Sequence, residues 1–330
     1  MITRHPKRFA ALTLAAAIST GSVFATDKPA ATPTAVPSSA PTPSRTLAPA
    51  APAGAGSYQV GTLLVERHGD HGTPVILIPG LASGAWAWTS TVRQLEGSHI
   101  VYVVTLPGFD GRPAVAGQAL PQALQSLREL IATQAPARPV LIGHSLGGIL
   151  ALQLAQQDSG SIAGVVSIDG LPVFPGTEGL TPVQRTAMVH NVRAQMSGMG
   201  KAQFTAMQGQ YMHGIGVLDA ATADRLAGLS SRSDAAAAGE AMAEVLALDL
   251  RARLGGITVP VLLMSPYNTA DGAAQNQSQA DKSAYYRSLM AGTPRVDVVS
   301  ISPSRHFAMF DQPGQVSAAI GNYLDALNAP

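Results

Sequence analysis

Seven short apolar runs recur along the chain after about residue 57, separated by turns, loops or stretches with helical periodicity. The runs, which we interpret as β-strands, are residues 61–67, 74–78, 100–105, 140–142, 164–168, 259–264 and 295–301. The helical periodicity is found in residues 118–134, 147–156, 278–291 and 315–327. Alternating strands and helices are typical of parallel strands joined by crossover helices. The pattern therefore predicts an α/β fold with a mostly parallel central sheet flanked by helices.

The first 56 residues show neither of these patterns. A basic stretch that ends at Arg8 precedes an apolar run at 9–18 and a small-x-small sequence ending at Ala25, which together predict a cleaved signal peptide over residues 1–25. The apolar run is about half of the roughly 20 residues that a membrane-spanning helix needs. We therefore expect no integral membrane segment in the mature chain, and export to the periplasm or the medium.

Residues 26–56 consist almost entirely of Ala, Pro, Thr, Ser and Gly. Such a composition buries too little apolar surface to offset the entropy of ordering the chain. We interpret this segment as a disordered linker, and residues 57–330 as the folded domain.

Composition and charge exclude several classes of function. Of 330 residues, 46% are apolar and only 12% are charged, which is typical of a globular protein. Lys and Arg number 21 against 20 Asp and Glu, and without residues 1–25 the balance is 18 basic against 20 acidic side chains. Such a chain has no basic field to attract nucleic acid. The absence of cysteine excludes thiolate nucleophiles, iron–sulfur clusters and cysteine-ligated zinc.

The most specific motif lies between a predicted strand and a predicted helix. The strand at 140–142 runs into Gly143-His144-Ser145-Leu146-Gly147, which is followed directly by the helical run from Gly147. A Gly-x-Ser-x-Gly sequence at a strand-to-helix corner is a nucleophile elbow, in which a tight turn exposes the serine hydroxyl. The backbone N–H of Leu146, at the start of the helix, can stabilise negative charge on a substrate oxygen. We therefore interpret Ser145 as a candidate nucleophile.

With this elbow the chain resembles the α/β-hydrolases over roughly residues 58–327. The segment 75–86 is similar to the family's strand and oxyanion loop, although Pro79 stands where many members have histidine. By that match, Leu81 would supply the second backbone N–H of the oxyanion hole. Residues 106–111 resemble a structural turn of the family, and residues 304–313 resemble its catalytic-histidine loop.

His306 is the candidate general base, because it alone among the histidines follows the last predicted strand in a loop that can reach Ser145. The resemblance places none of the other seven histidines in that role: His5, His68, His71, His99, His144, His190 and His213. His144 adjoins the nucleophile, but the family usually buries this side chain. A base at His306 would take the serine proton during attack and return it to the leaving group.

Two residues compete for the acid that orients His306. Many members of the family carry it after the strand that matches 259–264, but Asn268 stands there and Asp271 comes three residues later. The alternative is Asp169, which directly follows the strand at 164–168, a position that some lipase-like and dehalogenase-like members use. We favour Asp169, because the strand before it is expected to neighbour the strand that bears Ser145.

Between residues 171 and 255 the strand pattern stops, and the resemblance predicts a helical cap inserted there. Half of the chain's ten methionines gather at positions 188, 196, 199, 207 and 212 of this segment, near Phe204 and Tyr211. Methionine is flexible and fills irregular apolar space. These side chains either pack the cap onto the main domain or line an apolar pocket for an acyl or alkyl group.

Together these features predict a serine hydrolase that cleaves carboxylic esters, or amides, through an acyl-enzyme on Ser145. The expected partner is a small-molecule or lipid-like ester. The chemistry needs no cofactor, and the sequence contains no His-x-x-x-His pattern for a metal and no lysine after the elbow glycines for a phosphate. Alternatives are a cofactor-free perhydrolase or haloperoxidase activity of the same residues, and a non-catalytic binding module on this fold.

Overall fold

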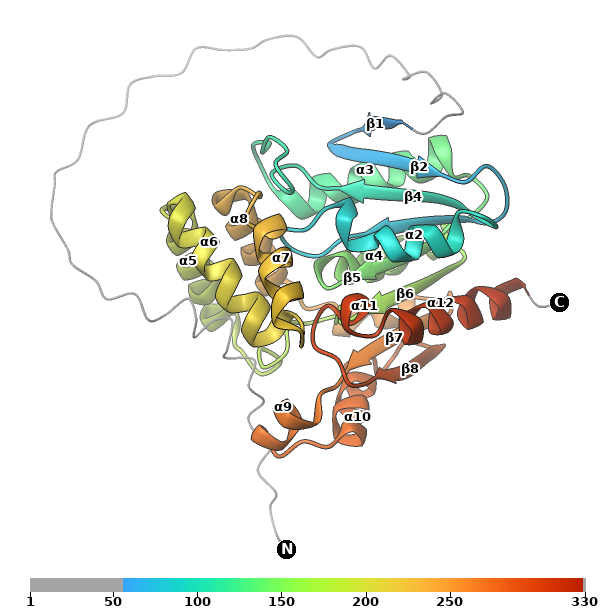
Figure 1. Ribbon diagram of the computed structural model, residues 1–330. Helices are drawn as coiled ribbons and strands as arrows, with labels where there is room; N and C mark the ends of the chain where they lie inside the picture. The colour runs from blue at the N-terminus through green and yellow to red at the C-terminus, as the bar shows by residue number, and fades with distance from the viewer. Residues whose placement is uncertain (1–55, 329–330) are drawn as a thin grey trace, which may run out of the picture.

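A computed structural model describes residues 56–328, so the predicted signal peptide and nearly all of the predicted linker lie outside the described residues. One eight-stranded sheet forms the centre of this part of the chain (Figure 1). Its strands are β1 (Ser57–Val60), β2 (Leu63–His68), β3 (Pro74–Ile78), β4 (Ile100–Thr105), β5 (Val140–His144), β6 (Gly164–Ile168), β7 (Val261–Pro266) and β8 (Val296–Ile301).

The strands lie in the order β1-β2-β4-β3-β5-β6-β7-β8. β1 pairs antiparallel with β2, and β2 pairs antiparallel with β4, whereas the pairs from β4 to β8 are parallel. The prediction of a mostly parallel sheet is thus confirmed. β5, β6 and β7 are consecutive neighbours, so their carboxyl ends meet at one edge of the sheet, where open α/β sheets assemble their sites.

One predicted strand is wrong in detail. The run at 61–67 corresponds to β2 but starts too early, because Gly61 and Thr62 form the turn of a hairpin whose first strand, β1, was not predicted. Gly61 has a φ of +53°, a backbone conformation that glycine adopts without the strain a side chain would bring. Because Tyr58 and Gln59 are polar, the pattern of apolar runs did not predict β1.

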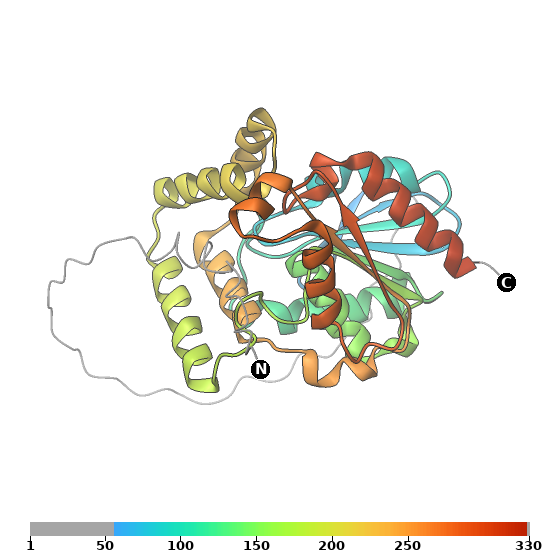
Figure 2. The same cartoon turned by 90° about the horizontal axis from the view of Figure 1, so that it is seen from below.

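Helices cover both faces of the sheet (Figures 1 and 2). They are α2 (Thr89–Leu95), α3 (Ala119–Gln134), α4 (Leu146–Gln157), α9 (Thr269–Ala274), α10 (Gln279–Leu289), α11 (Ala308–Asp311) and α12 (Pro313–Asn328). The four predicted helices correspond to α3, α4, α10 and α12. Along β3, Ile76 faces the core that contains α3, α4 and α10, whereas Leu77 faces the core that contains α2 and α12. This alternation follows from the two-residue period of a strand.

Four further helices lie between β6 and β7 in the sequence: α5 (Pro182–Ser197), α6 (Lys201–Tyr211), α7 (Ala220–Ser230) and α8 (Ala235–Ala247). Figures 1 and 2 show them gathered on one side of the sheet, which confirms a helical insertion in this segment. A capping box between Thr181 and Gln184 starts α5 by satisfying free backbone N–H groups. We call α5–α8 the cap.

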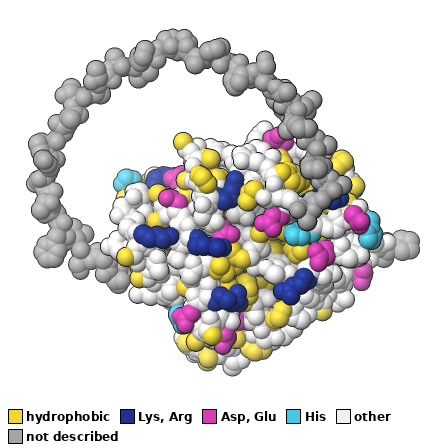
Figure 3. Space-filling model, turned by 45° about the horizontal axis from the view of Figure 1, so that its top comes forward, with side chains coloured by type: hydrophobic (Ala, Val, Ile, Leu, Met, Phe, Trp, Pro, Cys, Tyr) yellow, Lys and Arg dark blue, Asp and Glu magenta, His cyan; other side chains and the backbone are white. Residues whose placement is uncertain are grey.

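Charges of both signs are interspersed on the face drawn in Figure 3, and neither forms a continuous patch there. Of the helices in residues 56–328, none combines the length and the apolar character needed to cross a bilayer.

Candidate active site

Ser145 occupies a strained turn between β5 and α4. Its φ of +52° and ψ of −117° lie outside the regions that most residues adopt. Backbone hydrogen bonds hold the turn, since Ser145 N donates to Ile168 O at 2.8 Å. The glycines on either side are required by space: a Cβ on Gly143 would lie 2.2 Å from the Gly147 backbone, and one on Gly147 would lie 2.0 Å from Ile78 O. The predicted elbow is therefore present as a backbone geometry.

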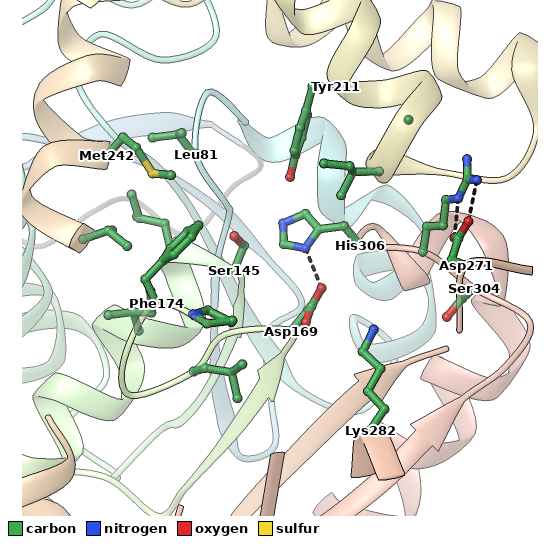
Figure 4. Close-up of a pocket in the computed structure, with 18 of the residues that line it drawn as sticks. Leu81, Ser145, Asp169, Phe174, Tyr211, Met242, Asp271, Lys282, Ser304 and His306 are labelled. Atoms are coloured by element: carbon green, nitrogen blue, oxygen red, sulfur yellow. Dashed lines mark hydrogen bonds and ion pairs between the residues drawn. The ribbon is translucent and has the colours of Figure 1, made fainter. Parts of the chain in front are cut away.

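His306 and Asp169, which are far apart in the sequence, form a hydrogen bond. His306 Nδ1 donates to Asp169 Oδ2 at 2.6 Å, and both side chains are largely buried. Asp169 directly follows β6, and His306 lies in the loop after β8. Figure 4 shows the Ser145 hydroxyl facing the same imidazole. No hydrogen bond joins Ser145 to His306 within residues 56–328, and such contacts are often long before substrate binds. With Nδ1 donating, Nε2 is the nitrogen left to accept a proton.

A second hydrogen bond and a balance of charges hold Asp169 ionised. The Tyr286 hydroxyl, from α10, donates to Asp169 Oδ1. Burial, the largest single influence, raises the pKa of the Asp169 carboxyl, but the electrostatic interaction and hydrogen bond with His306, together with smaller contributions from Lys282 and Tyr286, outweigh it. The net pKa of Asp169 therefore lies below its ordinary value. Burial and the charge of Asp169 raise the pKa of Tyr286, so its phenol remains a donor.

His144 has a structural place beside the candidate base. Burial, followed by the charge of His306, lowers the pKa of His144 to about 3, so its imidazole is neutral. Its Nε2 lies 3.0 Å from the backbone carbonyl of His306, to which it donates. The two rings lie 4.6 Å apart between centroids. His144 thus anchors the loop that carries His306.

Asp271, the alternative acid, has a different partner. Arg305 donates to it through two nitrogens, at 2.8 and 3.0 Å. The side-chain hydrogen bond from Arg305 lowers the pKa of Asp271, against a smaller opposing effect of burial. This pair lies on the far side of His306 from Ser145 (Figure 4). Of the two carboxylates, the structure brings only Asp169 to the His306 imidazole.

Two backbone N–H groups at Ser145 are free to bind a ligand oxygen. Leu81 follows β3 and Leu146 begins α4, and both line the same cavity as Ser145. Neither backbone N–H donates to a protein acceptor among the described residues. Unpaired backbone donors in a buried site are unusual, because burial without a partner costs free energy. The predicted oxyanion-hole residues therefore lie together with the nucleophile.

The cavity above Ser145 has a volume of about 460 Å³ and two chemically different walls. The cap contributes apolar side chains, among them Val192, Met196, Met207 and Met242. The segment from β7 to α10 and the His306 loop contribute polar and charged ones. Two of the methionines singled out in the sequence thus line the cavity, whereas Met212 is buried in the core.

Sequence reasoning missed three residues of this site. Tyr286 and Lys282 lie on the predicted helix 278–291, and Met242 lies on α8, which no sequence pattern distinguished. Tyr286 resembles an ordinary apolar helix position, and only the packing of α10 against β7 and β8 brings its hydroxyl to Asp169. Within residues 56–328, no three His, Asp or Glu side chains converge as metal ligands.

The chain matches a sequence profile, the alpha/beta hydrolase family, over residues 75–319. Among similar proteins is the pimeloyl-[acyl-carrier protein] methyl ester esterase of Pectobacterium carotovorum, at 28% identity over 120 residues, 36% of this chain and 46% of that protein. The protein of that name from Vibrio cholerae is 27% identical over 216 residues, 61% of this chain and 77% of its own. The chain thus spans about half the length of the first of these relatives.

Solved structures show the same fold. A thermophilic esterase from Thermogutta terrifontis superposes with a TM-score of 0.66 at 20% identity, over 83% of this chain and 100% of the other. A hydrolase from Pseudomonas aeruginosa superposes with a TM-score of 0.65 at 18% identity, over 79% and 94%. The profile match over residues 75–319, the sheet order and the elbow at Ser145 lead to one assignment: this chain belongs to the alpha/beta hydrolase family.

Proposed function

We propose that this protein is a carboxylesterase that forms an acyl-enzyme on Ser145. The observation that carries the proposal is the 2.6 Å hydrogen bond from His306 Nδ1 to Asp169, which leaves His306 Nε2 as a base beside the strained Ser145. An imidazole held in this tautomer by a buried carboxylate is the arrangement that activates a serine hydroxyl. Amide hydrolysis and perhydrolysis would use the same groups, but no contact in the cavity favours them.

In the proposed reaction, Ser145 Oγ attacks the ester carbonyl while His306 Nε2 takes its proton. The carbonyl oxygen becomes an anion and accepts hydrogen bonds from the backbone N–H groups of Leu81 and Leu146. Asp169 stabilises the imidazolium that forms. When the carbon–oxygen bond breaks, His306 gives the proton to the leaving alcohol, and water then hydrolyses the acyl-enzyme by the same route.

The apolar wall and the relatives support an ester as substrate. The cap side of the cavity offers Met196, Met207 and Met242 to an acyl chain, and such side chains reshape around different chain lengths. The names of the Pectobacterium and Vibrio relatives describe esterases. A small ester that places its carbonyl at Ser145 fits this combination.

A fluorophosphonate probe tests the proposed function. The protein is expected to incorporate one phosphonyl group on Ser145, located by peptide mass spectrometry, and to hydrolyse p-nitrophenyl butyrate until that label forms. Ser145→Ala, with its fold checked by circular dichroism, should take up no label. A folded wild-type protein that neither reacts with the probe nor cleaves p-nitrophenyl esters would be a binding module, and the proposal would be wrong.

Gly80 tests the oxyanion hole, whose donors are backbone groups that no substitution removes. A Cβ at Gly80 would lie 2.7 Å from His144 Nδ1 and 3.3 Å from Ser145 Cβ, so a side chain must displace the loop before Leu81. Gly80→Val is expected to lower kcat about a hundredfold, comparable to losing one donor. Steady-state kinetics on p-nitrophenyl butyrate measures this. A folded variant with wild-type kcat would contradict the role of the loop.

A further inference from the structure

We propose that the preferred ester carries a carboxylate on its leaving group, and that the Lys282 ammonium binds this carboxylate. The inference rests on the proposed function, because it assigns the two walls of the cavity to the two halves of an ester. It begins from the distribution of charge. The charged side chains among the described lining residues all lie outside the cap: Asp169, Asp271, Lys282, Arg305 and His306.

All but one of these charged groups already have partners. Asp169 accepts from His306 and Tyr286, and Arg305 forms its two-nitrogen pair with Asp271. Lys282 is the exception. Among residues 56–328, no carboxylate lies within 4.0 Å of its ammonium, and the ammonium donates no hydrogen bond. The contact found for it is the Tyr286 ring, whose centroid lies 5.7 Å from Nζ.

Lys282 is nevertheless close to the reacting groups. It lies on α10, half-buried, and Figure 4 shows its side chain pointing from that helix toward Asp169. Its charge contributes to lowering the pKa of both Asp169 and Asp271. A half-buried ammonium with no carboxylate beside it can gain a charge-assisted hydrogen bond from an anionic ligand. The cavity therefore holds a cation that is available to substrate.

The position of the base decides which half of the ester reaches Lys282. His306 must give its proton to the leaving oxygen, so the leaving group lies on the His306 side of Ser145. In Figure 4, Lys282 lies on that side, beyond Asp169, whereas Leu81, Phe174 and Met242 lie on the opposite side. The apolar wall is thus left for the acyl group, and the wall with the free cation for the leaving group.

A rival explanation gives Lys282 no contact with substrate. In that case its charge only stabilises the Asp169 carboxylate, and removing it would slow the cleavage of every ester by the same factor. If Lys282 contacts the substrate, its removal instead raises KM for the ester that makes this contact and leaves KM for the other esters unchanged. The two explanations therefore predict different ratios of kcat/KM between two esters, and this ratio does not depend on the overall activity of a variant.

The experiment compares p-nitrophenyl butyrate with the same ester carrying a carboxylate on the nitrophenyl ring, meta to the ester oxygen. For each variant, kcat/KM of the carboxylated ester is divided by that of the neutral one, so that intrinsic reactivity cancels between variants. Lys282→Met is expected to lower this ratio about tenfold, mainly through KM, as expected for a lost hydrogen bond between charged groups. Lys282→Arg should retain most of the ratio, because guanidinium also pairs with carboxylate.

Two controls sharpen the result. Arg287→Met removes a positive charge from the exposed face of the same helix and should leave the ratio unchanged. The p-nitrophenyl monoester of succinic acid has its carboxylate on the acyl side, so its kcat/KM relative to the neutral ester should be the same in Lys282→Met as in the wild type. An unchanged ratio in Lys282→Met, or an equal loss on the succinyl ester, would overturn the assignment of the walls. A protein with no Ser145-dependent turnover of any ester would instead overturn the proposed function.

Discussion

Replacing Ser145 or His306 by alanine is expected to lower kcat on p-nitrophenyl butyrate by about 10⁵-fold or more, and replacing both should cost no more than either change alone. The reason is that the two groups act in one step. Without His306 Nε2 to take its proton, the Ser145 hydroxyl is a poor nucleophile, and without Ser145 the base has no oxygen to activate. The activity that remains would come from the Leu81 and Leu146 N–H groups and from substrate binding.

Kinetics of the two single variants and the double variant measure this coupling. Each variant needs a wild-type circular dichroism spectrum, since the elbow at Ser145 is tightly packed against β3 and β6. A double variant whose loss equals the product of the two single losses would show that the residues act independently. That outcome would contradict a shared proton transfer between them.

Asp169→Asn is expected to lower kcat by about 10³- to 10⁴-fold, whereas Asp271→Asn should change it less than about tenfold. Asp169 accepts a hydrogen bond from His306 Nδ1 at 2.6 Å, so an asparagine amide in its place would favour the wrong imidazole tautomer and would not stabilise the imidazolium. Asp271 instead holds Arg305, at 2.8 and 3.0 Å. Its loss frees a guanidinium but leaves the imidazole hydrogen bond in place.

The two asparagine variants control for each other, because each removes one negative charge from the same cavity. Steady-state kinetics near neutral pH is the measurement, with folding checked by circular dichroism. Both native carboxyls have a pKa below the ordinary value, so both are ionised under these conditions. An inactive Asp271→Asn variant together with a fully active Asp169→Asn variant would reverse the assignment of the acid.

Local pattern accounts for the part of the fold that the sequence predicted. The apolar runs at 74–78 and 164–168 became the buried strands β3 and β6, because a strand covered on both faces needs apolar side chains at every position. The sequence did not predict the individual cap helices α5–α8, nor the short helices α2, α9 and α11. The hairpin of β1 and β2 was missed because its turn and its polar edge strand carry no apolar signal.

The candidate nucleophile and base were also within reach of the sequence. Ser145 is marked by glycines that the turn requires for lack of space, and His306 by its place after the last strand. Both signals are local, because each depends on a short stretch of sequence around the residue. Residues 1–56 remain predictions from the sequence alone.

The choice between two carboxylates and the character of the cavity walls needed the tertiary structure. Asp169 and Asp271 both follow strands of the sheet, and only the packing of the loops shows that one meets His306 and the other Arg305. Tyr286 and Lys282 look like ordinary helix positions until α10 packs against β7 and β8 near Asp169. The sequence by itself thus determined seven of the eight strands and the position of the candidate nucleophile, since these depend on neighbours along the chain. The partners of Asp169 lie 117 and 137 positions away and the partner of Asp271 lies 34 positions away, and only folding brings such residues together.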